Sequence, residues 1–467
     1  GLMPTILGAN SVRDTGYNVA NSCRFDGGDS DNLSRTNVSS VTNQFKWTFS
    51  FWVKLSDLET SRGTGNPFLF SDFTDSNNRG GIFFESDDTL RINDRVGGST
   101  VLERRTNRKF RDTSNFYHIV VNHDRTVSSP TTEVYVNGVE ETSFSATTNP
   151  SQNGTSAFNK ASESSLIGKF GGGNEFFNGY IAEAVWIDGQ ALDATSFGEF
   201  NDDSSSIWQP KDVSSLTFGN NGFYLDFEDS SNLGNDISGN SNDFTVNNLT
   251  AVDQSTDTCT NNFCTWSRLT PRHSAITLSR GALDITMGGT SRGIFGTIAV
   301  SSGKWYYEAK WVSGSFFEVG IVATSNMNDN DDVYGGKTGA FIYKSNGDIR
   351  VNGSTSTTVG SLSTGDIVGV AIDMDNGFVY FSKNGTFQNS GNPASGSSGT
   401  GGFNISANSE YIPAASPTSA VLSGNFGSPS FSISSGNSDS EGFGNFEFSV
   451  PSGYFAICTK NLAEYGG

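Results

Sequence analysis

The chain alternates apolar and polar residues in short runs, and this period of two is typical of β-strands. In residues 45–54, FKWTFSFWVK, nearly every second side chain is large and apolar. Similar runs occur at 116–122 and 180–187. The pair Asn137-Gly138 follows another run and supplies the positive φ angles that a two-residue hairpin turn requires. These patterns predict short antiparallel strands joined by tight turns.

A second series of strand-like runs begins near residue 263, after a stretch rich in Ser, Asn, Asp and Gly. We expect residues 304–312 and 317–322 to form a hairpin, and residues 191–200 to form a short peripheral helix. Two strand series with frequent turns predict an all-β fold of two jelly-roll or concanavalin-A-like β-sandwich domains in tandem. The predicted boundaries are 1–218 for the first sandwich, 219–262 for a connector with an edge strand, and 263–467 for the second sandwich.

Composition and charge narrow the function. The 467 residues include 55 Gly and 37 Phe but only 17% charged residues, as many short strands and turns require. The net charge of −20 argues against nucleic-acid binding, because neutralising phosphates takes clustered Lys and Arg. The densest basic stretch, residues 104–111, is interpreted as a solvated loop face. No run approaches the ~20 apolar residues of a membrane span, so we expect no membrane insertion, and no secretory signal is visible at the start.

Candidate catalytic residues are few, and we expect no enzyme. The histidines are His118, His123 and His273. The first two are five residues apart on a strand, on opposite faces, and so cannot hold one metal together. No serine has a nucleophile-elbow pattern, and no cysteine has a histidine nearby. A glycosidase needs two opposed carboxylates, whereas Glu183 stands alone within a strand pattern.

Two features stay open in the sequence. Four cysteines are too few for a disulfide scaffold, but Cys259 and Cys264 are close enough in the chain to close a local loop, as a bridge or as free thiols. Trp52 is out of phase with Trp47 and Phe51, so it lies on the other face of its strand. There it is either a contact with a second layer or an exposed stacking platform.

The densest cluster of oxygen ligands predicts a recognition loop after the strand near residue 319. Its candidate ligand-binding residues are Asn328, Asp329, Asp331, Asp332 and Tyr334. Their carboxylates have the chemistry of calcium ligands, but the glycine and the distal glutamate of an EF-hand loop are missing. We therefore expect no metal and no cofactor, with calcium as the alternative to a solvated acidic loop.

Ordered motifs in the first half resemble the laminin-G/concanavalin-A-like family. They are FYHIVV at 116–121, VYVNGV at 134–139, LIG at 166–168 and FNGYIAEAVWI at 177–187. The resemblance implies a β-sandwich of a kind found in lectins, adhesive modules and some glycosidases. The fold alone therefore says little about activity.

Motifs in the second half look like a SPRY domain. They include GKWYYE at 303–308, GDIVGVAID at 365–373 and VYFSKNGT at 379–386. The resemblance implies a bent two-sheet sandwich that recognises proteins or glycans mainly through loops at one edge.

Nearly the whole chain resembles virion proteins of marine tailed bacteriophages, through MPTILGAN at 3–10, FQNSGNP at 387–393 and the end from residue 451. The resemblance implies a non-enzymatic structural protein on the virion surface, as a tail fibre, appendage or capsid decoration, assembled in the host cytoplasm. Expected partners are other virion proteins, a host-surface glycan or protein, and further copies of the chain in a homo-oligomer. The alternative is a secreted, extracellular lectin or adhesin that binds glycans with calcium.

Overall fold

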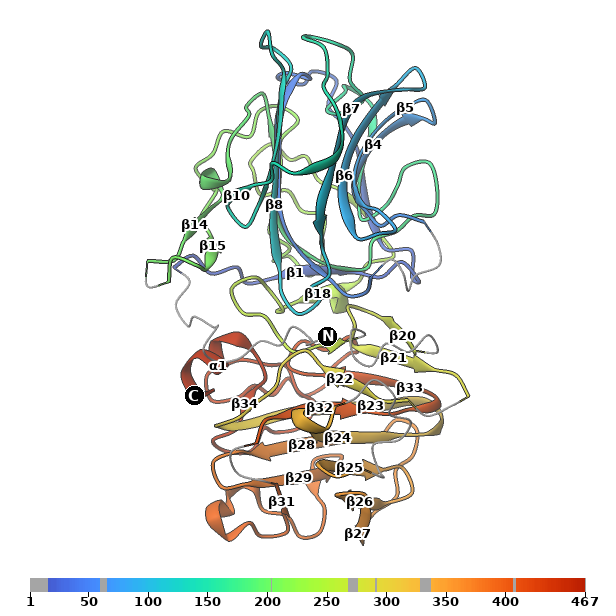
Figure 1. Cartoon of the computed structure of the whole chain (residues 1–467), viewed down its shortest axis with the longest axis vertical. Helices are drawn as coiled ribbons and strands as arrows, with labels where there is room; N and C mark the ends of the chain where they lie inside the picture. Colours follow the sequence, from blue (N-terminus) through green and yellow to red (C-terminus); the bar gives the residue numbers. More distant parts are fainter. Residues whose placement is uncertain are drawn as a thin grey trace. The chain divides into compact units, whose positions relative to one another are not determined.

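The structure is a computed structural model, and within its described residues the chain is nearly all β (Figure 1). The described residues divide into a first unit, which ends at Thr260, and a second unit, which starts at Asn261. Each unit is built from two large sheets, so the prediction of tandem β-sandwiches is confirmed. No helix among these residues is long and apolar enough to cross a membrane. The described ranges are 16–58, 65–202, 204–267, 276–289, 292–327, 337–405 and 409–466.

The first unit has two antiparallel sheets, which we call sheet A and sheet B. Sheet A has the order β10-β9-β8-β3-β13-β1-β18, with β16 on β13, and sheet B the order β11-β7-β6-β5-β4-β12-β2-β17. Sheet A comprises β1 (Ser22–Phe25), β3 (Lys46–Leu55), β8 (Tyr117–Asp124), β9 (Thr131–Val136), β10 (Val139–Glu140), β13 (Gly179–Asp188), β16 (Phe223–Leu225) and β18 (Gln254–Ser255). Sheet B comprises β2 (Asn32–Thr36), β4 (Phe68–Asp75), β5 (Asn78–Phe84), β6 (Thr89–Val96), β7 (Ser99–Lys109), β11 (Phe144–Thr148), β12 (Ser164–Ile167) and β17 (Thr245–Asn247).

Aromatic residues on the inner faces of sheets A and B form the core of the first unit. Strand β3 turns Trp47, Phe49 and Phe51 inward, as its alternation predicted, and all three are buried. The ring of Phe70 from sheet B stacks on Trp186 from sheet A, with centroids 4.8 Å apart. Burial of large aromatic side chains and their offset stacking both stabilise such a core.

A buried ion pair also joins the two sheets. Arg125, which follows β8, donates to Asp94 of β6 over 2.6 Å, and both side chains are almost fully buried. The backbone N–H of Ala157 and the hydroxyl of Ser156 donate to the same carboxylate. The guanidinium also donates to His123 over 2.8 Å. The negative charge of Asp94 is therefore balanced by one cation and two further hydrogen-bond donors.

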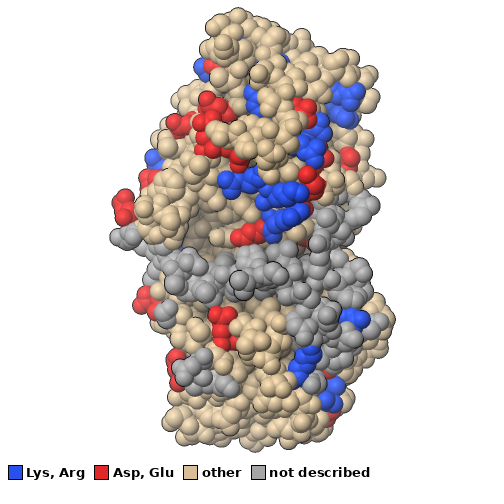
Figure 2. Space-filling view, in the orientation of Figure 1, with Lys and Arg blue, Asp and Glu red and all other residues tan. Residues whose placement is uncertain are grey.

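The basic stretch 104–111, expected to be a loop face, lies largely on strand β7, so that interpretation is wrong. Figure 2 shows Lys and Arg gathered on the side of the first unit that carries β5–β7, with Asp and Glu among them. Arg105 lies 3.2 Å from Asp87, Arg108 lies 2.7 Å from Glu141, and Arg111 lies 2.6 Å from Asp88. Strand pairing with β6 and β11 explains the extended backbone.

Residues 219–260 contribute β16, β17 and β18 to sheets A and B and lie within the first unit, whereas residues 261 and 262 of the predicted connector belong to the second. The helix expected at 191–200 is wrong. Only Ala194–Ser196 forms a single 3-10 turn, and Gly198–Phe200 is strand β14, which pairs with β15 (Trp208–Pro210). Gly198 lies against Trp208, where a Cβ would meet the indole at 2.7 Å, and this tertiary contact replaces the helix.

The second unit also has two large sheets and a short C-terminal helix, α1 (Thr459–Tyr465). One sheet has the order β19-β22-β32-β24-β25-β26-β27, with bounds Trp266–Ser267, Ile294–Gly296, Tyr411–Ala415, Glu318–Ala323, Ala340–Lys344, Asp348–Val351 and Ser354–Thr358. The other has the order β20-β21-β33-β23-β28-β29-β30, with bounds Ile276–Ser279, Asp284–Met287, Thr418–Asn425, Lys304–Phe316, Ile367–Asp373, Phe378–Lys383 and Thr386–Phe387. Strand β31 (Phe403–Asn404) pairs with β29, and β34 (Phe455–Ala456) pairs with β23. Further 3-10 turns are Ala251–Asp253 in the first unit and Thr324–Asn326 and Pro393–Ser398 in the second.

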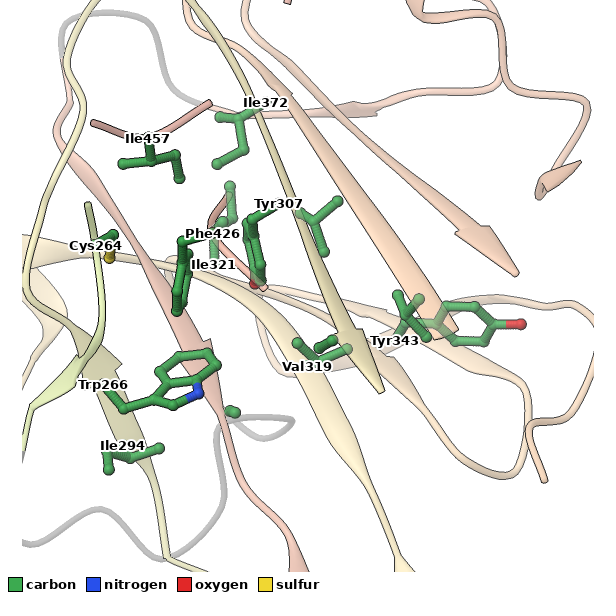
Figure 3. Packing of buried hydrophobic residues seen from close by; sticks show 14 of the residues in the cluster. Cys264, Trp266, Ile294, Tyr307, Val319, Ile321, Tyr343, Ile372, Phe426 and Ile457 are labelled. Carbon is green, nitrogen blue, oxygen red and sulfur yellow. The ribbon is translucent and has the colours of Figure 1, made fainter. Parts of the chain in front are cut away.

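Strands β23 and β24 do not form the expected hairpin, because they belong to different sheets. The chain crosses the sandwich at Phe317, which is fully buried. Figure 3 shows Tyr307 of β23 and Phe426 side by side in the core near Ile321 of β24. The Tyr307 and Phe426 rings stack with centroids 5.1 Å apart. Both segments alternate like hairpin strands, but the core they share lies between two sheets.

We predict that Arg125→Leu destabilises the protein by about 3–5 kcal/mol, because it leaves the Asp94 carboxylate buried without its cation. Urea unfolding followed by tryptophan fluorescence measures this change. Arg108→Leu is the matched control: its side chain is 48% exposed, so its loss should cost less than about 1 kcal/mol. Equal effects of the two substitutions would contradict the role given to the buried pair.

Candidate ligand-binding site

The outer face of sheet A is covered. Trp52 points outward, as its phase predicted, but it is only 4% exposed. Its ring stacks on His118 with centroids 4.5 Å apart, and the Trp208 ring lies with its centroid 6.0 Å from that of the same imidazole. Trp52 is therefore a contact with a covering layer and not an exposed platform.

His118 lies in a buried chain of hydrogen bonds beside Ser50. The indole N–H of Trp208 donates to Nδ1 of His118 over 2.8 Å, which leaves the imidazole proton on Nε2. Nε2 then donates to the Ser50 hydroxyl over 2.8 Å. Burial lowers the pKa of His118 to about 3, so the ring is neutral. A histidine that donates to a serine cannot take its proton, so this pair is structural. His118 and His123 lie on opposite faces of β8, as predicted, because His118 contacts the outward Trp52 and His123 the inward Trp47.

Glu183 is a second buried group on sheet A. It lies at a bulge in β13 with a φ of 51°, and its carboxylate accepts a hydrogen bond from the Tyr224 hydroxyl over 2.6 Å. The Tyr17 hydroxyl lies 3.0 Å from that of Tyr224. Burial raises the pKa of Glu183 to about 8. The carboxyl group is enclosed by the tyrosines and is not one wall of a cleft.

The outer face of sheet B is different, because it carries its own aromatic layer. Phe68 of β4 and Phe83 of β5 stack with centroids 4.3 Å apart, and Phe170 stacks on Phe68 at 4.7 Å. Gly81 makes room for this layer, since a Cβ there would lie 2.6 Å from the Phe68 ring. Each of the three rings is less than a tenth exposed, so they form a compact apolar floor.

A glycine-rich hairpin at 168–177 places Phe170 over the sheet. Lys169 and Phe176 form its antiparallel bridge, and the N–H of Phe170 donates to the carbonyl oxygen of Glu175 over 2.9 Å. Gly171 at its tip lies against Phe73 of β4, where a Cβ would collide with that side chain. Close approach of the hairpin to the sheet therefore depends on the missing side chain.

Polar side chains surround the aromatic floor and enclose a hollow of about 240 Å³, which we call the arginine hollow. The alternation in β6 turns Arg91, Asn93 and Arg95 outward, while Leu90, Ile92 and Asp94 face the core. Its polar walls include Arg79, Arg91, Asn93, Arg95, Thr100 and Glu175.

The guanidinium groups of the arginine hollow differ in their partners. Arg91 lies 2.7 Å from both Glu85 and Glu103 and is neutralised by them. Arg79 lies over the Phe170 ring, 5.1 Å from its centroid. Burial lowers the pKa of Arg79, the charge of Arg95 lowers it further, and Glu175 acts in the opposite sense. Arginine keeps its charge at all ordinary pH values, so the hollow is lined by cations.

A second hollow of about 540 Å³ lies elsewhere on the outer face of sheet B. Its asparagine side chains hydrogen-bond with their own neighbours: Asn247 donates to Asn32 over 3.1 Å and to Ser34 over 3.0 Å. The ammonium of Lys169 lies over the Phe176 ring at 5.1 Å. Because these polar groups already have partners, the arginine hollow is the better candidate for binding a ligand.

The predicted recognition residues Asn328, Asp329, Asp331, Asp332 and Tyr334 lie outside the described residues, so the calcium alternative stays a prediction. Among the residues that are described, no group of three His, Cys, Asp or Glu side chains could hold a metal ion. None of the four cysteines is in a disulfide, so Cys259 and Cys264 are not bridged.

Reasoning from the sequence missed the arginine hollow. Residues 89–92 and 81–85 both read as strands, and extending the first to Arg95 would have placed Arg91, Asn93 and Arg95 on one face. The contribution of Arg79 depends on strand pairing, and that of Phe170 on a hairpin that returns to the sheet. No local pattern contains that information.

Comparison with family models locates two known domains in tandem. A model of the concanavalin A-like lectin/glucanases superfamily matches residues 26–196, and a model of the SPRY domain matches residues 304–426. Laminin-G-like and SPRY domains are typically non-catalytic binding domains, and no enzymatic family is matched. The two domain families therefore suggest a ligand-binding or adhesin-like module. None of the comparisons indicates a phage or virion origin. No curated protein matches the sequence.

Several solved structures have similar folds. One is the SPRY domain of human HERC1, with 18% identity over 32% of this chain and 91% of that one and a TM-score of 0.26. Another is native heptameric SAP-like pentraxin from Limulus polyphemus, with 19% identity over 38% of this chain and 80% of that one and a TM-score of 0.28. Stonustoxin is a third (16% identity over 35% of this chain and 27% of that one, TM-score 0.27).

We predict that Glu183→Gln removes part of the loss of stability that accompanies rising pH. The folded chain holds a proton on Glu183 up to about pH 8, whereas the unfolded chain releases it near pH 4.5. The contribution of Glu183 to the free energy of unfolding is therefore complete below pH 4.5 and is lost as the pH rises toward 8. The loss is at most about 1.4 kcal/mol per pH unit.

Chemical denaturation at pH 5 and pH 8 measures the change, and the exposed Glu199→Gln is the control. Burial also raises the pKa of Asp31 to about 7 and that of Asp72 to about 6. These two groups add the same pH dependence to the stability of the wild-type protein, Glu183→Gln and Glu199→Gln. An identical decline in the wild-type protein and Glu183→Gln would refute the assignment.

Proposed function

We propose that this chain is a non-enzymatic attachment protein that binds a surface glycan in the arginine hollow of its first unit. The observation that carries this proposal is an aromatic floor walled by guanidinium, amide and hydroxyl groups on the outer face of sheet B, beside the hairpin that carries Phe170. Sugars present hydroxyl groups at their edges and C–H groups on their faces, and this combination complements both. Pockets that orient small ligands have the same mixture of apolar lining and a few polar groups.

The arrangement of the catalytic-type residues supports binding rather than turnover. The buried Ser50–His118 pair has the wrong proton placement for a nucleophile, and Glu183 is enclosed by Tyr224. Within the arginine hollow, Glu175 is the one carboxylate among the lining residues that the structure describes. Hydrolysis of a glycosidic bond needs a pair of carboxyl groups.

We further propose that the chain acts on the surface of a phage particle, as a tail fibre, appendage or capsid decoration. The support is the resemblance of its opening, its loop at 387–393 and its end to tailed-phage virion proteins. In this setting its partners are other virion proteins and further copies of itself, and the SPRY domain provides a second recognition module. A secreted, extracellular lectin that requires calcium is the alternative setting.

We predict that Thr100→Trp weakens glycan binding by at least about tenfold, because an indole on this exposed rim residue fills the arginine hollow. A glycan array, followed by calorimetry with the best ligand, measures the loss. Thr147→Trp, on the exposed edge strand β11 of the same sheet and outside the hollow, is the matched control.

Binding should persist when a chelator is added, because the hollow has cationic walls rather than a carboxylate cluster. Binding that survives Thr100→Trp would place the ligand elsewhere on the protein. Binding that disappears with the chelator would favour the calcium-dependent lectin.

We predict that mass spectrometry of purified virions detects this chain at a copy number that is a multiple of the order of a symmetry axis of the particle. Antibodies against the chain should label the particle exterior. Both outcomes follow from a surface-displayed homo-oligomer. Lysate proteins of similar abundance that are removed by density-gradient purification provide the control. Loss of the chain together with those proteins would rule out the virion setting, but not glycan binding.

A further inference from the structure

Two like charges stand directly opposite each other in sheet B. Arg79 of β5 and Arg95 of β6 are cross-strand partners in the antiparallel register. Both side chains point to the outer face and line the arginine hollow. Like charges at directly opposed positions destabilise a sheet, so this pair has a cost in the unliganded protein.

This pair lacks the compensation that other arginines of the same face have. Arg91 is held by Glu85 and Glu103, and Arg105 lies 3.2 Å from Asp87. Among the residues that the structure describes, neither Arg79 nor Arg95 has a carboxylate within ion-pair distance. Arg95 donates to the carbonyl oxygen of Gly98 over 2.8 Å. The carboxylate of Glu175 lines the same hollow and acts on Arg79 electrostatically, but among the described residues it forms no ion pair with either arginine.

Resting on the glycan-binding function proposed above, we infer that Arg79 and Arg95 bind the anionic group of one acidic sugar unit, a carboxylate or a sulfate ester. Guanidinium groups match carboxylate and sulfate oxygens with paired, charge-assisted hydrogen bonds. The bound anion would also relieve the repulsion between the two arginines. Asn93 of the same face and Thr100 of the rim supply the donors and acceptors that hydroxyl groups of the same sugar require.

The volume of the hollow and the net charge of the chain restrict the range of ligands further. A hollow of about 240 Å³ lies below the ~300–1,000 Å³ typical of drug-sized pockets, so it fits a single sugar unit. The net charge of −20 repels a long polyanion, whereas one charged unit at a chain end or branch meets mainly the local field of the arginines. An acidic terminal sugar on an otherwise neutral glycan therefore fits better than a uniformly charged polymer or a nucleic acid.

The experiment uses the full chain and three versions of one short oligosaccharide. The first ends in a uronate, the second is the same compound with its carboxyl group reduced to the alcohol, and the third has a sulfate ester in place of the carboxylate. Calorimetry with the wild-type protein, Arg79→Gln and Arg95→Gln measures the affinities. Arg105→Gln is the matched control, because Arg105 lies on the same sheet but already has Asp87 as partner.

We expect the wild-type protein to bind an anionic form at least about tenfold more tightly than the reduced form, and each of Arg79→Gln and Arg95→Gln to abolish that preference. Arg105→Gln should change no affinity more than about twofold. Without ligand, Arg79→Gln and Arg95→Gln should each melt at the wild-type temperature or above it, because each removes the repulsion between the two arginines. This result would exclude misfolding as the cause of the lost preference for the anion. The better of the uronate and the sulfate identifies the anion.

Other outcomes separate the two proposals. Equal binding of the anionic and reduced forms, both lost in Thr100→Trp, overturns this inference and leaves the proposed function intact. Tighter binding of a single-stranded oligonucleotide than of any sugar also overturns it. A preference for the anion that survives both Arg79→Gln and Arg95→Gln assigns the charge to another site. Binding of no sugar at all overturns the proposed function.

Discussion

In every sheet of this protein, successive side chains point to opposite faces, and only one face of each sheet can lie in the sandwich core. The other face is then either covered by another segment or left to solvent. On sheet A, Trp208 of the covering layer encloses His118, and Tyr224 on the outer face of the sheet's own strand β16 encloses Glu183. On sheet B, the segment that folds over the face, within the part of the chain that the structure describes, is the short hairpin that carries Phe170. The position of the arginine hollow follows from this difference.

The same constraint explains how charge is distributed. Inward-facing ionic groups must be paired, because an uncompensated charge in the core is costly, and Asp94 with Arg125 satisfies this requirement across the two sheets. Arginines on the outer face do not have this requirement. Arg91 and Arg105 nevertheless have acidic neighbours, so the opposed Arg79 and Arg95 are distinguished by their surroundings and not by their residue type.

Much of the fold was predictable because β-strand periodicity is local. The phase of β3 placed Trp47 inward and Trp52 outward, and the Asn137-Gly138 turn has the positive φ angles that its dipeptide requires. The predictions that were wrong concern pairing. The helix expected at 191–200 became a 3-10 turn and a strand, because strand β15 pairs with Gly198–Phe200 and its Trp208 packs on Gly198. Strands β23 and β24 alternate as hairpin strands do, but they lie in separate sheets.

The amino-acid sequence by itself determined which side chains share a strand face, where the tight turns fall, and the tandem of a concanavalin-A-like domain with a SPRY domain. These depend on neighbours within about ten residues, whose relative directions the backbone sets. Only the tertiary structure decided that Arg79 lies opposite Arg95, that Trp208 directs the proton of His118, and that Phe170 returns to sheet B. Those relations are set by hydrogen bonds and packing between segments far apart in the chain, and alternation along one strand carries no information about its partner.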